Sequence, residues 1–279
     1  MKVLYENSID SNTTITPSSE DSNFTFETAF NDKRLTRFGR FTGIVSENIV
    51  FSKSAGFDLD SVIVANNNIS SSATVKFQAH IENVWTSPYL DVTLSRLDNG
   101  YYYYEFSTTP TPPNENFYED LSGDTYADES GNNYTDFSGS AYIYCRILIT
   151  DPTSSESYIK LSKVYVGLNK SLPGIAPTAE LPVTSNSVVE QSLSGQVFSD
   201  KRTQLKGANV SFPVINETER QTLKTFFATV DKTEPFYLLV WENDLDIEPP
   251  LYCTLTSDLE IKKANGISYS ADFSFIENK

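Results

Sequence analysis

The sequence has few of the residue types on which most enzyme centres depend. Among 279 residues there are one histidine, two cysteines and one methionine. A single histidine excludes histidine-rich zinc sites, and it argues against a Ser-His-Asp triad because any serine would need His80 as its base. The chain also lacks an HExxH motif, a CxxC motif and a glycine-rich phosphate loop. The 37 acidic residues make accidental carboxylate pairs certain, so such pairs alone do not indicate a glycosidase. We therefore expect no enzyme and no cofactor.

Long apolar runs are absent as well. No stretch approaches the ~20 residues of a membrane span, and residues 1–7 lack the apolar segment of a secretory signal. The net charge of −16 opposes binding along nucleic acid, because a polyanion repels an acidic protein.

Cys145 and Cys253 each lie in an apolar run, so we expect two buried thiols, with a disulfide or a thiol site as the alternative. Buried thiols fit assembly in a reducing cytoplasm.

Aromatic residues are abundant, with 18 Phe and 16 Tyr, and large rings favour strands. A polar segment rich in Ser, Thr and Asn predicts an N-terminal arm over residues 1–22. The alternation of Phe24 to Glu27 predicts a first strand after this arm. Apolar or alternating runs between turn residues predict further strands at 57–65, 73–79, 101–106, 141–149 and 158–166.

A boundary and one helix organise the second half of the chain. Two prolines and a glycine within residues 172–177 cannot continue an element, so we expect a linker there. Asn216 followed by Glu219 predicts a capping box at the start of a helix over about 217–230. An apolar stripe supports this helix. Its members are Leu223, Phe226, Phe227 and Val230. Around the helix we expect a hairpin of 187–191 with 195–198, and strands at about 203–214, 236–241, 251–255 and 267–275.

An acidic loop from about 114 to 139 offers a candidate calcium site. Asp120, Asp124 and Asp128 lie among glycines and backbone carbonyls, which are the oxygen ligands that a hard cation prefers. The spacing matches no EF-hand. A solvated acidic loop is the alternative, so the sequence indicates no metal beyond this calcium candidate.

Two other groups of residues are candidate contact sites. Tyr101 and Tyr103, in the run Tyr101 to Tyr104, could stack on a sugar ring, although an ordinary strand with half of these rings in the core is the alternative. Arg34, Arg37 and Arg40 recur at every third residue, and this cluster could dock on an acidic neighbouring subunit. Scattered surface charge explains the arginines equally well.

The order of segments in the first half resembles a known fold. The run from Phe57 to Val64, its Asn-rich turn and the run from Ala73 to Phe77 resemble the centre of a galactose-binding-like (discoidin-type) jelly roll. Residues 144–152 are similar to the "aromatic-x-Arg-Ile-x-Ile-x-Asp-Pro" strand of that fold, and residues 158–167 to its closing strand. Cys145 stands where Trp or Arg is common, and the 109–139 loop is long. No sugar-binding residue carries over.

The part after the linker resembles the tail-tube-derived domains of siphophage minor and distal tail proteins. In those domains a hairpin precedes a strand, an amphipathic helix with an acidic start, a "Pro-Phe-x-Leu" strand and a final alternating strand. The same order runs here from Val188 to Phe275, with Pro235 to Leu238 as the "Pro-Phe-x-Leu" strand.

The two resemblances imply a mainly β fold: a β-sandwich (jelly roll) domain plus a second β domain carrying one short amphipathic helix. The expected limits are an arm at 1–22, the sandwich at 23–168, a linker at 169–186 and the second domain at 187–279. The implied function is a structural component of a phage tail tip, part of an oligomeric ring that joins the tail tube to the baseplate or fibres.

Such a protein is assembled in the host cytoplasm and located in the virion. Its expected partners are other copies of itself, other tail and baseplate proteins and a host surface glycan, but no nucleic acid and no membrane. The N-terminal arm and residues 178–206 are the candidates for reaching across subunits, because exposed strand edges pair with neighbours. The alternative function is a stand-alone carbohydrate-binding module or adhesin.

Overall fold

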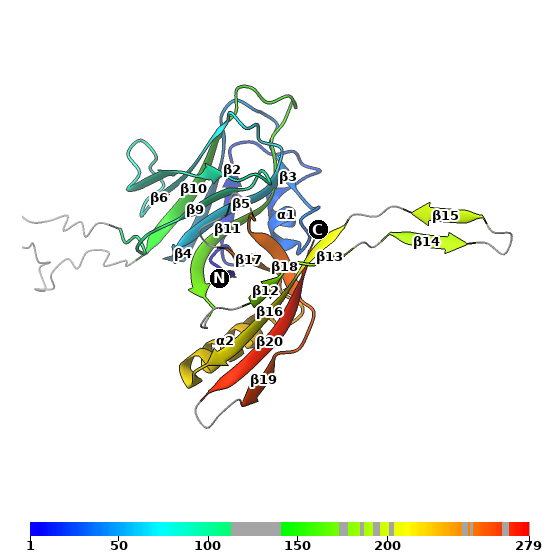
Figure 1. Cartoon of the computed structure of the whole chain (residues 1–279). Coiled ribbons are helices and arrows are strands. Elements are labelled where there is room, and N and C mark those ends of the chain that lie inside the picture. The colour runs from blue at the N-terminus through cyan, green and yellow to red at the C-terminus, as the bar shows by residue number, and fades with distance from the viewer. Residues whose placement is uncertain are drawn as a thin grey trace, which may run out of the picture.

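Strands dominate the computed structural model, as the aromatic-rich sequence predicts (Figure 1). The structure describes residues 1–112, 141–172, 178–184, 187–191, 196–200, 204–241, 245, 248–263 and 268–278. Within these residues the helices are α1 (Phe26–Asn31) and α2 (Glu217–Val230). The strands are β1 (Lys2–Asn7), β2 (Thr14–Pro17), β3 (Gly39–Arg40), β4 (Glu47–Phe57), β5 (Ser61–Asn67), β6 (Thr74–His80), β7 (Leu90–Thr93), β8 (Ser95–Arg96), β9 (Tyr102–Glu105), β10 (Tyr142–Thr150), β11 (Lys160–Ser171), β12 (Thr178–Glu180), β13 (Val183–Thr184), β14 (Val188–Gln191), β15 (Val197–Asp200), β16 (Leu205–Ile215), β17 (Phe236–Leu239), β18 (Leu251–Leu255), β19 (Glu260–Lys263) and β20 (Tyr269–Glu277).

The first half of the chain forms a sandwich of two antiparallel sheets, which we call the sandwich lobe (α1 and β2 to β11). One sheet has the order β2-β4-β10-β6-β7, and the other contains β11, β5, β9 and β8. Alternate residues of each strand point into the space between the sheets, as the period of two requires. Phe77 of β6 and Ile147 of β10, which pair across the ladder, are fully buried there. The predicted β-sandwich is confirmed.

The second half forms a helix packed on a sheet, which we call the helical lobe (α2, β12, β13 and β16 to β20). The predicted capping box is present, because Asn216 Oδ1 accepts from Glu219 N at 2.9 Å and Glu219 Oε2 accepts from Asn216 N at 2.7 Å. Leu223, Phe226 and Val230 on one face of the helix are buried against the sheet. The predicted helix and its apolar stripe are therefore confirmed.

Strand β1 joins the two lobes into one sheet. The long sheet has the order β12-β16-β20-β18-β17-β1-β11-β5-β9-β8, so β1 lies between β17 and β11. Val3 pairs with Leu238 on one side and with Lys170 on the other. The side chains of Val3 and Leu4 point to opposite faces, and both are fully buried. The prediction of an N-terminal arm over residues 1–22 is wrong here: β1 and β2 are paired strands. The predicted domain limits stay a prediction.

Helix α1 lies where the sequence predicts a strand. Phe24 to Glu27 alternates, but Thr25 caps the helix by accepting from Thr28 N at 3.4 Å. The carboxylate of Glu20 accepts from Phe26 N at 2.7 Å, which satisfies another amide of the first turn. Thr25 is therefore the sequence signal for a helix here, and the alternation of Phe24 to Glu27 points to a strand instead.

The predicted hairpin of residues 187–198 is confirmed and stands apart from both lobes. Strands β14 and β15 pair with each other from Val188↔Asp200 to Gln191↔Val197 and form a separate two-stranded sheet. Figure 1 shows the hairpin projecting away from the rest of the molecule. Such a hairpin is marginal by itself in water, so it gains stability when another surface covers it.

Both faces of the long sheet are covered near its centre. One face carries the two lobe cores, and on the other lies a cluster that draws on both lobes. Its buried members are Leu4, Leu35, Ile63, Ala65, Leu97, Tyr103, Tyr165, Tyr237, Leu239 and Tyr252. We call these residues the interlobe cluster. No helix in the described part of the chain is long and apolar enough to cross a membrane.

Candidate binding surfaces

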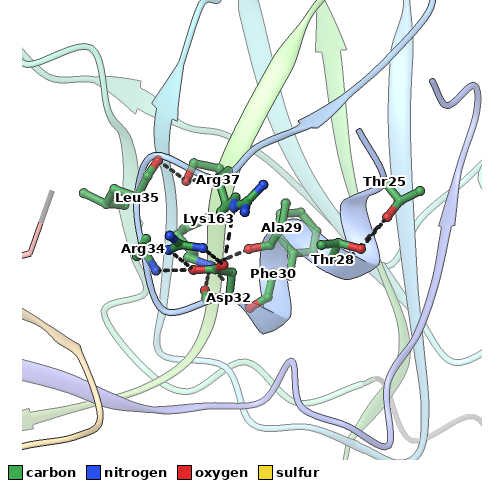
Figure 2. A network of polar contacts seen from close by, with 10 residues as sticks. Thr25, Thr28, Ala29, Phe30, Asp32, Arg34, Leu35, Arg37 and Lys163 are labelled. Carbon is green, nitrogen blue, oxygen red and sulfur yellow. Dashed lines mark hydrogen bonds and ion pairs between the residues drawn. The ribbon is translucent and has the colours of Figure 1, made fainter. Parts of the chain in front are cut away.

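A buried lysine holds the C-terminal end of α1 to strand β11 (Figure 2). Lys163 is 7% exposed, and its ammonium group donates to three backbone oxygens at the end of this helix. The acceptors are Ala29, Phe30 (3.5 Å) and Asp32. The last carbonyls of a helix lack partners within the helix and carry partial negative charge, so a cation suits this position. Burial lowers the pKa of Lys163 to about 8, against the opposing charge of Asp32.

The arginines predicted as assembly contacts have carboxylate partners within the chain. Arg34 binds Asp32 with both nitrogens of its fork, at 3.0 Å for Nε–Oδ1 and 2.8 Å for Nη2–Oδ2. These hydrogen bonds hold the pKa of Asp32 far below its usual range. Arg37 lies 3.6 Å from Asp32, and Arg40 lies 3.5 Å from Asp21. The positive charge of the cluster is thus largely matched, and its role in docking stays a prediction.

A cavity of about 300 Å³ opens where the two lobes meet. We call it the junction cavity. Aromatic rings from five different elements line it. These are Tyr5, Phe30, Tyr165, Phe236, Tyr237 and Tyr252. The charged groups of its lining are already engaged: Lys33 and Glu234 form an ion pair of 2.6 Å across the two lobes, and Lys163 binds backbone oxygens. The cavity therefore suits an uncharged ring better than an ion.

Tyr237, which lines this cavity, has a buried hydroxyl that is unsatisfied within the described residues. The residue is 3% exposed, and its hydroxyl has no hydrogen-bond partner among the described residues. Neighbouring hydroxyls do have partners: Tyr252 donates to the Lys33 carbonyl at 3.0 Å, and Tyr165 to the Leu168 carbonyl at 2.6 Å. Burial raises the pKa of Tyr237 well above its usual value, so its hydroxyl stays protonated. An unpaired buried hydroxyl costs about 1–3 kcal/mol, so Tyr237 lowers the stability of this region.

Of the two tyrosines predicted to contact sugar, Tyr103 is buried and Tyr101 is partly exposed, so a sugar contact of Tyr101 stays a prediction. Tyr103 is 6% exposed and belongs to the interlobe cluster, and its hydroxyl donates to Glu105 Oε2 at 2.8 Å. Tyr101 packs against the same cluster, and burial raises its pKa. Tyr102 is buried in the opposite core. The prediction assumed one solvated face, but β9 belongs to a sheet that is covered on both sides, so consecutive tyrosines are buried.

A planar cluster that the sequence did not reveal lies on the outer face of the five-stranded sheet. The guanidinium group of Arg146 lies 4.5 Å from the ring centre of Trp85, and its Nε donates to Gln78 Oε1 at 2.8 Å. Arg146 and Gln78 are register partners on β10 and β6. Trp85, in the β6–β7 connection, remains partly exposed. The stack offers a partly exposed ring beside a guanidinium group, while the amide of Gln78 beneath them is only 5% exposed. The alternation of β6 puts the side chains of Gln78 and Phe77 on opposite faces of the sheet. This pattern could have predicted that Gln78 lies on the outer face.

His80 and the cysteines show no reactive arrangement. His80 is 6% exposed and stacks on Tyr89 at 4.1 Å, and its Nδ1 accepts from Glu82 N at 2.9 Å. Cys145 and Cys253 are free, buried thiols, as predicted, and burial raises both of their pKa values. A thiol with a raised pKa is a poor nucleophile at neutral pH.

The described residues contain no group of three or more His, Cys, Asp or Glu side chains that could hold a metal ion. The candidate calcium ligands Asp120, Asp124 and Asp128 lie outside the described residues. Calcium binding by this loop stays a prediction.

Comparisons with known proteins give a likeness to carbohydrate-binding modules at the level of structure alone. No family model and no curated protein matches the chain. The solved CBM32-1 module of a family 31 glycoside hydrolase from Clostridium perfringens is 7% identical, with a TM-score of 0.38, over 59% of this chain and 99% of that one.

Two other modules give similar values. CpGH89CBM32-6 of Clostridium perfringens is 10% identical, with a TM-score of 0.37, over 58% of this chain and 98% of that one. The CBM32 module of AlyQ, solved with 4,5-unsaturated mannuronic acid, is 15% identical, with a TM-score of 0.34, over 58% of this chain and 96% of that one. All three are modules of the galactose-binding-like type that the first half of the sequence resembles. Scores this low carry no inference about a ligand.

Proposed function

We propose that this chain is a non-catalytic structural protein that associates with copies of itself through the β14–β15 hairpin. The observation that carries the proposal is the isolation of this hairpin, whose two strands pair only with each other within the described residues. Val197 on the hairpin and Val183 just before it are 64% and 58% exposed. A projecting ribbon with an exposed valine and two open edges gains hydrogen bonds and apolar burial when it lies on a neighbouring subunit.

The setting that we propose is the tip of a phage tail, where such copies would form a ring. Support comes from the order of segments after the linker, which resembles tail-tube-derived domains. The net charge of −16 also suits a surface that meets other proteins and avoids nucleic acid. Mass spectrometry of purified virions tests this setting. We expect the chain in tailed particles and not in tailless ones, and its absence from tailed particles would contradict the proposal.

Replacing residues 188–200 with a short Gly-Ser linker tests self-association. We expect an oligomer for the full chain and a monomer for the variant, by light scattering after gel filtration and by electron microscopy. The midpoint of thermal unfolding of the monomer serves as a control, because the hairpin pairs with no strand of either lobe in the described residues. A full chain that stays monomeric at high concentration, or a variant that still assembles, would refute the proposal.

Carbohydrate binding is the second candidate function, and the outer-face cluster around Trp85 favours it. A tryptophan ring stacks on the face of a sugar, and the partly exposed guanidinium group of the neighbouring Arg146 offers hydrogen bonds to hydroxyls. The acidic surface repels acidic glycans, so we expect neutral ones. A glycan array compares the full chain with Trp85→Ala and, as the matched control, Trp241→Ala. Loss of binding only in Trp85→Ala supports this function, and equal signals from all three proteins exclude this site.

A further inference from the structure

We propose that the outer face of the five-stranded sheet binds an unbranched, β-1,4-linked neutral glycan lengthwise along strand β10. The proposal rests on carbohydrate binding, the second candidate function above, and it names the class of glycan and the way in which the glycan lies. The feature that carries it is a line of three side chains on β10, Tyr144, Arg146 and Leu148, with the ring of Trp85 placed 4.5 Å from the guanidinium group of Arg146.

This line of side chains faces away from the sandwich core. Cys145 and Ile147 of β10 are fully buried in that core, so the residues on either side of them point to the other face. Tyr144, Arg146 and Leu148 are each partly exposed there. Alternate residues of a strand are about 7 Å apart, so the line extends for roughly 14 Å. A single sugar ring is too short to cover this length, whereas a short linear chain of sugars covers it.

The chemistry of this face suits the flat side of a neutral sugar chain. In a β-1,4-linked glucose chain the equatorial hydroxyl groups point to the edges, and C–H groups cover the two flat sides. Such C–H groups pack on aromatic rings, which Trp85 and Tyr144 supply. The partly exposed guanidinium group of Arg146 donates hydrogen bonds to hydroxyl groups at the edge of the chain. Lys76 and Asp91, on the two strands beside β10, pair with each other at 3.1 Å and add no unmatched charge.

A series of soluble oligosaccharides tests the length and the shape of the ligand. The probes are glucose, its β-1,4-linked oligomers up to the hexamer, and the α-1,4-linked hexamer, which coils and has no flat side. Binding is measured by calorimetry on the full chain and by the fluorescence of Trp241→Ala, in which Trp85 is the one remaining tryptophan. We expect the dissociation constant to fall roughly tenfold or more from glucose to the β-1,4-linked trimer. The β-1,4-linked hexamer should bind more tightly than the α-1,4-linked one.

Variants along the line test the contact surface. We expect Trp85→Ala and Tyr144→Ala each to raise the dissociation constant of the β-1,4-linked hexamer roughly tenfold, because each removes a ring from the platform. Trp85→Phe keeps a ring and should lose less. Tyr158→Ala is the matched control and should bind like the full chain, because Tyr158 is also a partly exposed ring beside an arginine, with Arg40 at 4.0 Å, but lies away from β10. The midpoint of thermal unfolding shows that each variant is folded.

Four results would overturn this inference and leave carbohydrate binding standing. They are glucose binding as tightly as the β-1,4-linked hexamer, equal binding of the two hexamers, weakened binding in Trp85→Ala but not in Tyr144→Ala, and a glycan array whose ligands contain no β-1,4-linked chain. An array without any binding would refute the inference together with the second candidate function. If Trp85→Ala dissociates oligomers of the full chain and no glycan binds, this face is a contact between subunits and the inference is wrong.

Discussion

The unfolding free energy should depend on pH through Lys163 in a direction opposite to that of most paired cations. Burial lowers the pKa of Lys163 to about 8, from 10.5 in an unfolded chain. Between these values the unfolded state binds more protons than the folded state, so the free energy of unfolding rises as pH rises through this window. The full shift of about 2.5 pKa units sets an upper limit of roughly 3.4 kcal/mol, at 1.36 kcal/mol per unit. Carbonyl oxygens of Ala29 and Asp32 stabilise the ammonium form, so we expect about 1–3 kcal/mol.

The assay compares the full chain with Lys163→Met by urea unfolding at several pH values between 7 and 11. Methionine keeps much of the length of the side chain but does not titrate. The tyrosines with raised pKa values titrate in both proteins, so their contribution cancels in the difference. The stability advantage of the full chain over the variant should grow with pH across the window. A difference that stays flat, or that shrinks as pH rises, would refute the idea that desolvation dominates at this lysine.

Three further substitutions test the fold. Asn216→Ala removes half of the capping box with Glu219 and should lower the free energy of unfolding by about 1 kcal/mol, measured by urea denaturation. Phe77→Ala empties the centre of the sandwich core and should cost about 3–5 kcal/mol; a cost under 1 kcal/mol would place Phe77 outside that core. In Gly167→Ala, the added methyl group would collide with the carbonyl oxygen of Glu6 on β1. It should therefore speed hydrogen exchange in β1, and unchanged exchange would contradict the pairing of β1 with β11.

Local signals in the sequence predicted those elements that a few neighbouring residues determine. The helix α2 needs only its cap at Asn216 and a stripe of apolar residues, and both lie within 15 consecutive positions. The β14–β15 hairpin likewise depends on nearby residues. Thr25 shows the limit of this approach, since one capping side chain turned an alternating segment into helix α1.

Features that combine distant segments could not be predicted in the same way. Tyr5, Tyr165 and Tyr237 meet in the junction cavity although more than 70 residues separate each from the next. The burial of Tyr103 depends on a second layer over its sheet, which the alternation of a single strand does not reveal. The short strand β1 lies within a segment whose composition is polar, so the composition alone predicted an arm. The residues that pair with β1 are on β11 and β17, far along the chain.

The position of β1 determines how mechanical load passes through the molecule. A pull applied at the hairpin reaches β12, β13 and β16 first. From there it passes to the sandwich lobe along the backbone that links β12 to β11, and across the long sheet through β20, β18, β17 and β1. The interlobe ladder is only as strong as the short pairing of β1 on either side, with three register pairs to β17 and four to β11. We therefore expect tension between the lobes to separate β1 from its partner strands before either core unfolds. The short ladders of β1 would then set the force at which the two lobes come apart.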